Sequence, residues 1–195
     1  MVIGLCGRMG TGKSEALKIF SEFGLNVIDC DDVSRIVCAP GKPCLAELCV
    51  AFGEDILLSD GTLNRPALAE KCFSSTEKTR ALNAITHRHV IDYIRNWVKS
   101  CNGDCVVAAP LLFESGFDRE CDITLALIAE FDVLCSRMSG RFSEQDFKAR
   151  VSIHYADKFL IKNCDYVIEN SGTIEQLRKK IELFLLCIGK YGGIE

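Results

Sequence analysis

The residues with the clearest chemical meaning lie near the N-terminus, in the octapeptide GRMGTGKS at positions 7–14. This segment fits the phosphate-binding pattern G-x-x-x-x-G-K-[ST] without a mismatch. Its glycines let phosphate oxygens approach the backbone, because a Cβ would block that approach. Lys13 adds a mobile cation, and the Ser14 hydroxyl is a suitable ligand for a Mg²⁺ ion that bridges two phosphates. The alternative is an ordinary glycine turn before a helix.

The context of the octapeptide favours the phosphate loop. The apolar run VIGLC at 2–6 precedes it, and an amphipathic helix is predicted from Lys13 to Phe23, ended by Gly24. A loop between a strand and a helix directs its backbone N–H groups and the helix N-terminus at one anion. The residues predicted to bind ATP in this loop are Gly10, Thr11, Gly12, Lys13, Ser14 and Glu15.

A cluster of carboxylates follows the second apolar run, LNVID at 25–29, in the sequence IDCDD. Ligands of doubly wound sheets bind at this carboxyl edge. Along an extended strand, alternation would place Asp29 and Asp31 on one face. A carboxylate beside the terminal phosphate can orient an acceptor hydroxyl and take its proton, so Asp31 is the candidate catalytic base. The alternative is that Asp31 or Asp32 only caps the next helix.

Cations for the transferred phosphoryl group are expected in the polar helical region after residue 129, where Arg137, Arg141 and Arg150 lie. Such groups stabilise charge on the equatorial oxygens when a segment closes over the site. Arg137 and Arg141 are the predicted catalytic cations, and a solvated helix face is the alternative for each. His87, in NAITHRHV, is either a contact to a phosphate of the acceptor or an ordinary residue of an amphipathic helix.

The elements that must position these residues alternate between strands and helices. Further apolar runs lie at 105–110, 123–129 and 166–169, which gives five strands in all. Between the second and third strands, a turn is predicted at 60–65, with helices at 65–73 and 76–100. A last helix is predicted from Thr173 to about Ile188, with Thr173 as its cap. The fold class is therefore α/β, a five-stranded parallel sheet with helices on both faces.

The composition of the chain and the motifs that it lacks argue against several classes of function. A chain of 195 residues with a net charge of −4 has no general cationic field for nucleic acid or membrane. The sequence contains no apolar run of membrane-spanning length and no secretory signal, which predicts a cytoplasmic protein. Its 12 cysteines include no C-x-x-C pair, so we expect reduced, mostly structural thiols rather than a zinc site. The sequence also lacks the N-K-x-D that reads guanine and a Walker B aspartate after either central strand, which argues against a GTPase or motor.

Six segments in order along the chain resemble the dephospho-coenzyme A kinase family. They are GRMGTGKS, NVIDCDDVSR, DGTLNRPALAEKCF, LNAITH, PLLFE at 110–114 and DYVIENSG at 165–172. The resemblance implies a P-loop kinase fold and transfer of the ATP γ-phosphoryl group to the ribose 3′-hydroxyl of dephospho-coenzyme A, with Mg²⁺ as cofactor. It implies Asp31 as the base and Asn170 as a contact near adenine. It further implies that acceptor-binding residues are Asp31, Arg35, Arg65, His87 and Glu114.

The resemblance also divides the single domain into regions. The nucleotide-binding core is expected at 1–39, 105–136 and 163–195, a helical acceptor-binding insertion at 40–104, and a helical lid at 137–162. The chain departs from the family at Glu15, Arg88, His154 and Leu160; a lysine is common where Leu160 stands.

Two other functions stay open from sequence alone. One is a different small-metabolite kinase of the nucleoside or shikimate type, and the other is a nucleotide-binding scaffold without turnover. We expect a monomer or weak homo-oligomer.

Overall fold

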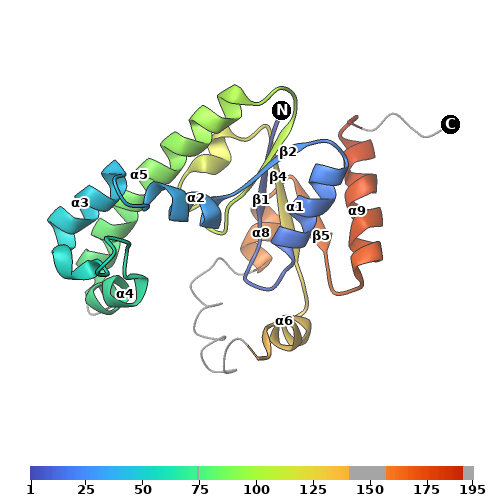
Figure 1. The fold of residues 1–195 in the computed structure, drawn as a ribbon. Coiled ribbons are helices and arrows are strands. Elements are labelled where there is room, and N and C mark those ends of the chain that lie inside the picture. The colour runs from blue at the N-terminus through green and yellow to red at the C-terminus, as the bar shows by residue number, and fades with distance from the viewer. Residues whose placement is uncertain (74, 141–156, 191–195) are drawn as a thin grey trace. The chain divides into compact units, whose positions relative to one another are not determined.

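The computed structural model describes residues 1–73, 75–140 and 157–190 (Figure 1). It forms two compact units. The first, called here the sheet unit, comprises Met1–Asp29 and the described residues from Cys101 onward. The second, the helical unit, comprises Cys30–Ser100.

The sheet unit contains five parallel strands in the order β2-β3-β1-β4-β5. Their bounds are β1 Val2–Cys6, β2 Asn26–Asp29, β3 Cys105–Ala108, β4 Ile123–Ile128 and β5 Tyr166–Glu169. From β1 the chain crosses toward one edge of the sheet to form β2, and from β3 it crosses toward the opposite edge to form β4. The direction of the connections therefore changes between the neighbouring strands β1 and β3. In parallel α/β sheets, the crevice at the carboxyl ends of two such strands is where ligands bind.

One face of the sheet is covered by α1 (Lys13–Glu22) and α9 (Ile174–Cys187), which lie side by side (Figure 1). Apolar residues of both helices join inward residues of the strands in one core: Ile3, Leu5, Ala16, Leu17, Ile19, Phe20, Val106, Ala108, Leu125, Leu127, Ile168, Leu177, Ile181, Phe184 and Leu185. The helix α9 begins at a capping box, in which Thr173 and Gln176 satisfy each other's backbone N–H groups.

Residues that alternate with this core point to the other face of the sheet. That face is met by η2 (Phe117–Glu120) and by α8 (Asp157–Asn163), which contacts β4 and β5. The helix α6 (Phe131–Met138) follows β4 at the carboxyl edge. Leu160 of α8 is buried, with 4% of its surface exposed. Leu160, one of the departures noted in the sequence, is therefore a residue of the core.

The helical unit contains α2 (Cys30–Val37), α3 (Pro43–Phe52), η1 (Glu54–Ile56), α4 (Arg65–Phe73) and α5 (Thr76–Ser100). The long helix α5 is its spine, because α2, α3 and α4 all contact it. In the part of the chain that the structure describes, no helix is both long and apolar enough to cross a membrane.

The predicted α/β class with five parallel strands is confirmed. The predicted bounds of β1, α4, α5 and β5 match the observed ones. The compact helical unit spans Cys30–Ser100. The expected assignment of 40–104 to acceptor binding and 137–162 to a lid is a statement about function and stays a prediction.

Candidate active site

The phosphate-binding loop lies at the carboxyl end of β1, beside the point where the strand connections change direction. The helix α1 begins at Lys13, directly after Gly12, which has a left-handed backbone with φ 95°. Gly12 is the N-cap residue and offers no side chain to bond the first N–H groups of the helix. These N–H groups carry the positive end of the helix dipole, so an anion such as phosphate can bind them.

Hydrogen bonds inside the loop fix its shape before any ligand is present. The Thr11 side chain is fully buried, and its hydroxyl donates to the Arg8 carbonyl oxygen at 2.8 Å. The Lys13 ammonium donates to the carbonyl oxygens of Gly7 at 2.7 Å and Arg8 at 3.2 Å. The cation therefore lies across the loop, where it can transfer its hydrogen bonds to phosphate oxygens without a large movement.

Asn170, predicted as a contact near adenine, contacts the phosphate loop itself. Its side chain is 5% exposed, and its amide donates to the Thr11 carbonyl oxygen at 2.8 Å. A Cβ on Gly12 would lie 2.6 Å from the Asn170 amide nitrogen, closer than any real contact. Gly12 is thus required both for its backbone conformation and for the approach of Asn170. The adenine contact stays a prediction.

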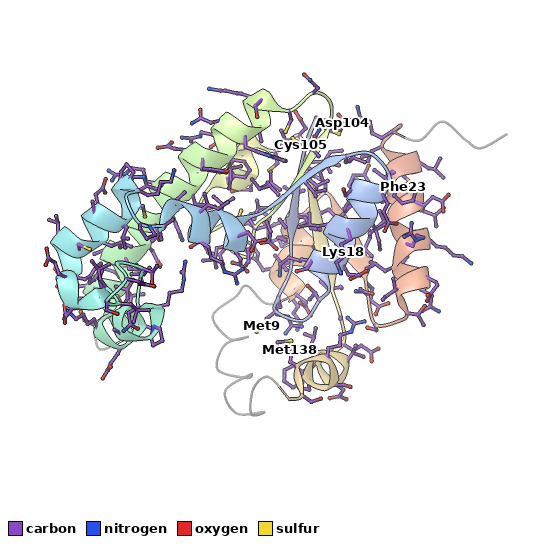
Figure 2. The ribbon with its side chains drawn as sticks, in the orientation of Figure 1. Met9, Lys18, Phe23, Asp104, Cys105 and Met138 are labelled. Atoms are coloured by element: carbon purple, nitrogen blue, oxygen red, sulfur yellow. The ribbon has the colours of Figure 1, made fainter. Side chains whose placement is uncertain are left out.

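Arg137, predicted as a catalytic cation, is brought to the same loop by α6. Its guanidinium donates to the carbonyl oxygens of Gly10 at 3.4 Å and Gly172 at 3.2 Å. Apolar contacts support this placement, because Met138 packs with Leu134, and Figure 2 shows Met138 beside Met9 of the loop. The structure therefore places a second positive charge at the loop, and the catalytic role of Arg137 stays a prediction.

A residue pair that sequence reasoning missed ties the loop to α8. The guanidinium of Arg8 forms an ion pair with the carboxylate of Asp157, the first residue of α8. Arg8 occupies an unconstrained position of the phosphate-loop pattern, and Asp157 is far away in the sequence. No local signal in the sequence links them.

Carboxylates lie at the same edge of the sheet unit. In the register, Asp29 of β2 pairs with Ala108, which pairs with Leu5, so Asp29 is level with the residue two positions before the start of the loop at Gly7. Glu114 follows β3, and partial desolvation raises the pKa of its carboxyl group above the usual range. Glu114 is also close enough to Cys6 to affect that thiol electrostatically.

Asp31 lies in the helical unit, where it is exposed in the first turn of α2. Because α2 begins at Cys30, two sequence interpretations are wrong. Asp31 does not share a strand face with Asp29, since β2 ends at Asp29. Neither Asp31 nor Asp32 is the N-cap, because both follow the first helical residue.

The other predicted acceptor-binding residues of the helical unit lie on three helices. Arg35 pairs with Asp32 at 2.7 Å on α2, and Arg65 of α4 donates to the Ser34 carbonyl oxygen at 3.4 Å. The structure thus brings two arginines to α2, the helix that carries Asp31. His87 lies on α5, and burial lowers the pKa of its imidazole, which favours the neutral form.

The remaining predicted catalytic cation, Arg141, lies outside the described residues, as do Arg150 and His154. Among the residues that are described, no three His, Cys, Asp or Glu side chains gather as a metal site.

Comparison with known proteins decides between the kinases that share this loop. The family model described as dephospho-CoA kinase matches residues 1–176. The chain belongs to the dephospho-CoA kinase family. A dephospho-CoA kinase from Corynebacterium efficiens is 39% identical over 186 residues, which cover 92% of this chain and 93% of that protein.

Solved structures agree with the dephospho-CoA kinase fold. A crystal structure of a Thermus thermophilus protein has a TM-score of 0.83 at 26% identity, covering 96% of this chain and 97% of that one. The dephospho-CoA kinase from Campylobacter jejuni has a TM-score of 0.71 at 20% identity, covering 97% of each chain, which supports the fold. The predicted family and P-loop kinase fold are therefore confirmed.

Proposed function

We propose that the chain transfers the γ-phosphoryl group of ATP to the ribose 3′-hydroxyl of dephospho-coenzyme A, giving coenzyme A and ADP. This is the final step of coenzyme A synthesis. The observation that carries the proposal is the match to the dephospho-CoA kinase family over residues 1–176 together with an intact phosphate loop. Another metabolite kinase shares the loop, but the family match does not favour it.

The positive groups of the sheet unit bind and stabilise the phosphates. The loop N–H groups at 10–15 hold the β- and γ-phosphates, and Lys13 neutralises charge that develops during transfer. Arg137 adds charge from the side of Gly10, where its guanidinium already lies. We assign Arg141 to the same task.

A Mg²⁺ ion would be held here by the Ser14 hydroxyl at the first turn of α1 and by Asp29, which ends β2 at the same edge of the sheet, on the far side of β3. The chemistry that Mg²⁺ would supply there is Lewis-acid stabilisation of the negative charge on the phosphates. The protein's contribution there is to orient the nucleotide so that the γ-phosphorus faces the acceptor.

The helical unit supplies the acceptor side. We assign Asp31 as the base that takes the proton of the 3′-hydroxyl, with Arg35, Arg65 and His87 as contacts to the acceptor. Glu114 is assigned to the same substrate from the sheet unit. The region 40–104 then binds the acceptor, 137–162 closes over the site, and the reaction takes place in the cytoplasm without a nucleic-acid or membrane partner.

The test is a coupled assay for ADP, with purified protein, ATP, Mg²⁺ and dephospho-coenzyme A as sole acceptor. Lys13→Ala and Asp31→Asn should each lower kcat by about 10²-fold or more. Lys18→Ala, an exposed change on the same helix as Lys13, and Asp92→Asn on α5 serve as matched controls and should retain activity.

Turnover with shikimate or a nucleoside and none with dephospho-coenzyme A would favour the other metabolite kinases. Binding of ATP with no turnover on any acceptor would indicate a scaffold. Full activity in Asp31→Asn would remove Asp31 from its assigned role while leaving the substrate assignment intact.

A further inference from the structure

Two cysteines that the proposed reaction does not use lie against each other beneath the phosphate loop. The Sγ atoms of Cys6 and Cys164 are 3.5 Å apart, although 158 positions separate them in the sequence. Cys6 is the last residue of β1 and directly precedes Gly7. Cys164 directly follows α8, and its backbone N–H donates to the Leu160 carbonyl oxygen at 2.9 Å. Both sulfur atoms are therefore carried by well-defined backbone.

The two thiols differ in ionisation and in access to solvent. The hydrogen bond between the two thiols raises the pKa of Cys6 and lowers that of Cys164. Burial raises the pKa of Cys6 further, since 1% of its surface is exposed. Cys164 is only partly buried. Cys164 is thus the more accessible and more readily ionised of the two thiols, and Cys6 is a neighbouring thiol protected from solvent.

A second close pair lies in the helical unit and provides a comparison. The Sγ atoms of Cys38 and Cys44 are 3.6 Å apart. Both residues are buried, at 3% and 1% exposed, and burial with the neighbouring Cys38 raises the pKa of Cys44 to about 12. Neither sulfur atom of this pair is exposed, and the Cys44 thiol is held in its protonated form, so the pair should react slowly.

We propose that Cys6 and Cys164 form an oxidisable dithiol that reacts with hydroperoxides, and that the resulting disulfide reversibly weakens ATP binding at the phosphate loop. The effect on catalysis rests on the function proposed above. The disulfide and the effect on nucleotide binding do not.

The chemistry is a two-electron oxidation in two steps. The Cys164 thiolate attacks one oxygen of the hydroperoxide, the O–O bond breaks, and Cys164 becomes a sulfenic acid as the peroxide leaves as an alcohol or water. The Cys6 thiol then loses its proton and attacks the Cys164 sulfur atom, and water leaves as the S–S bond forms. In sum, two thiols lose two electrons and two protons, and the hydroperoxide is reduced to the alcohol and water.

Formation of the disulfide draws together the end of β1 and the end of α8, next to the loop. The S–S bond is about 2.05 Å long, so the sulfur atoms must approach by roughly 1.5 Å from their present separation. Gly7, the residue after Cys6, packs closely against its neighbours, since a Cβ there would lie 2.4 Å from the Leu127 carbonyl oxygen and 2.8 Å from the Thr11 hydroxyl, so a displacement of Cys6 is passed on to the loop. The far end of α8 is already tied to the loop by the Arg8–Asp157 ion pair. The strain therefore reaches the residues that hold phosphate.

The experiment uses the reduced full-length protein, treated with hydrogen peroxide and then quenched. Intact mass should fall by two hydrogen atoms, and digestion without reductant should recover Cys6 and Cys164 in one linked peptide. ATP binding, measured by calorimetry without acceptor, should weaken by about 10²-fold and recover on addition of dithiothreitol. The Cys164→Ser variant should lack the linked peptide and keep its ATP affinity after peroxide.

Two matched variants complete the design. Cys187→Ser removes an exposed thiol of α9, and Cys44→Ser removes the second pair; both should remain as sensitive to peroxide as the wild type. If Cys164→Ser does not fold, as judged by its thermal melt, Cys164→Ala replaces it. Three outcomes would each overturn the proposal. They are a linked peptide of Cys38 and Cys44 instead, a sulfinic acid at Cys164 with no link, and a Cys6–Cys164 disulfide that leaves ATP affinity unchanged. A reduced protein that binds ATP but does not phosphorylate dephospho-coenzyme A would contradict the proposed function alone.

Discussion

The ion pair between Arg8 and Asp157 should stabilise the phosphate loop, and its contribution can be isolated. The perturbation is Asp157→Asn, which removes the charge and keeps the size of the side chain. The variant leaves the Arg8 guanidinium partly buried without its carboxylate. Because Arg8 belongs to the loop and Asp157 to α8, stability and ATP binding should change together.

The expected loss of stability in Asp157→Asn follows from how deeply the two side chains are buried. The side chains of Arg8 and Asp157 are 14% and 26% exposed. Breaking a buried pair costs about 3–5 kcal/mol, whereas an exposed pair contributes about 0–1 kcal/mol. Arg8 Nε and Asp157 Oδ1 are buried with no hydrogen-bond partner among the described residues, which reduces the contribution of the ion pair to the free energy of unfolding. We therefore expect Asp157→Asn to lower the free energy of unfolding by about 2 kcal/mol.

The assay is a double-mutant cycle in urea, with Arg8→Met, Asp157→Asn and the double variant. The double variant should be more stable than either single variant, because no charge remains buried and unpaired, with a coupling energy of about 1–2 kcal/mol. The KM for ATP should rise in both single variants. The exposed Lys18–Glu15 pair is the control and should show a coupling below about 0.5 kcal/mol. A coupling equally small for Arg8 and Asp157, with unchanged KM, would refute the reasoning.

Three other changes test separate parts of the structure. Gly12→Ala should lose most ATP binding and about 2 kcal/mol of stability, because it combines φ 95° with a Cβ 2.6 Å from the Asn170 amide. Calorimetry measures the ATP affinity and urea unfolding measures the stability. Wild-type affinity would contradict the close approach of Asn170 to Gly12. Leu160→Lys should lower the free energy of unfolding by about 3 kcal/mol without raising kcat, since it places an ammonium group in the core. A variant with a higher kcat and unchanged stability would show instead that position 160 serves the lid. Burial alone would raise the pKa of Asp104, but hydrogen bonds from the N-terminal ammonium and Lys190 outweigh it and lower that pKa. The carboxylate therefore stabilises the fold at neutral pH and loses this effect as pH falls through its folded pKa, so the stability difference from Asp104→Asn should shrink in acid; a difference independent of pH would contradict this assignment.

Local patterns predicted most elements of this protein. The octapeptide at 7–14 identified the phosphate loop, because only glycines permit its backbone and only a lysine adds the mobile cation. Apolar runs identified the five strands, since buried parallel strands are apolar on both faces. Thr173 with Gln176 marked the start of α9, because a capping box is a short-range interaction. The end of β2 was harder: nothing in IDCDD distinguishes a continuing strand from a helix that begins at Cys30.

Sequence alone thus determined the family resemblance, the kind of ligand and the elements that surround it, because these depend on neighbouring residues. The tertiary structure decided which distant residues meet at the loop. Asn170 against Gly12, Arg137 on Gly10, Arg8 with Asp157, and Cys6 against Cys164 all join segments more than 120 positions apart. Such contacts arise when strands β1, β4 and β5 align and bring their following loops to one edge, and no local pattern encodes that alignment.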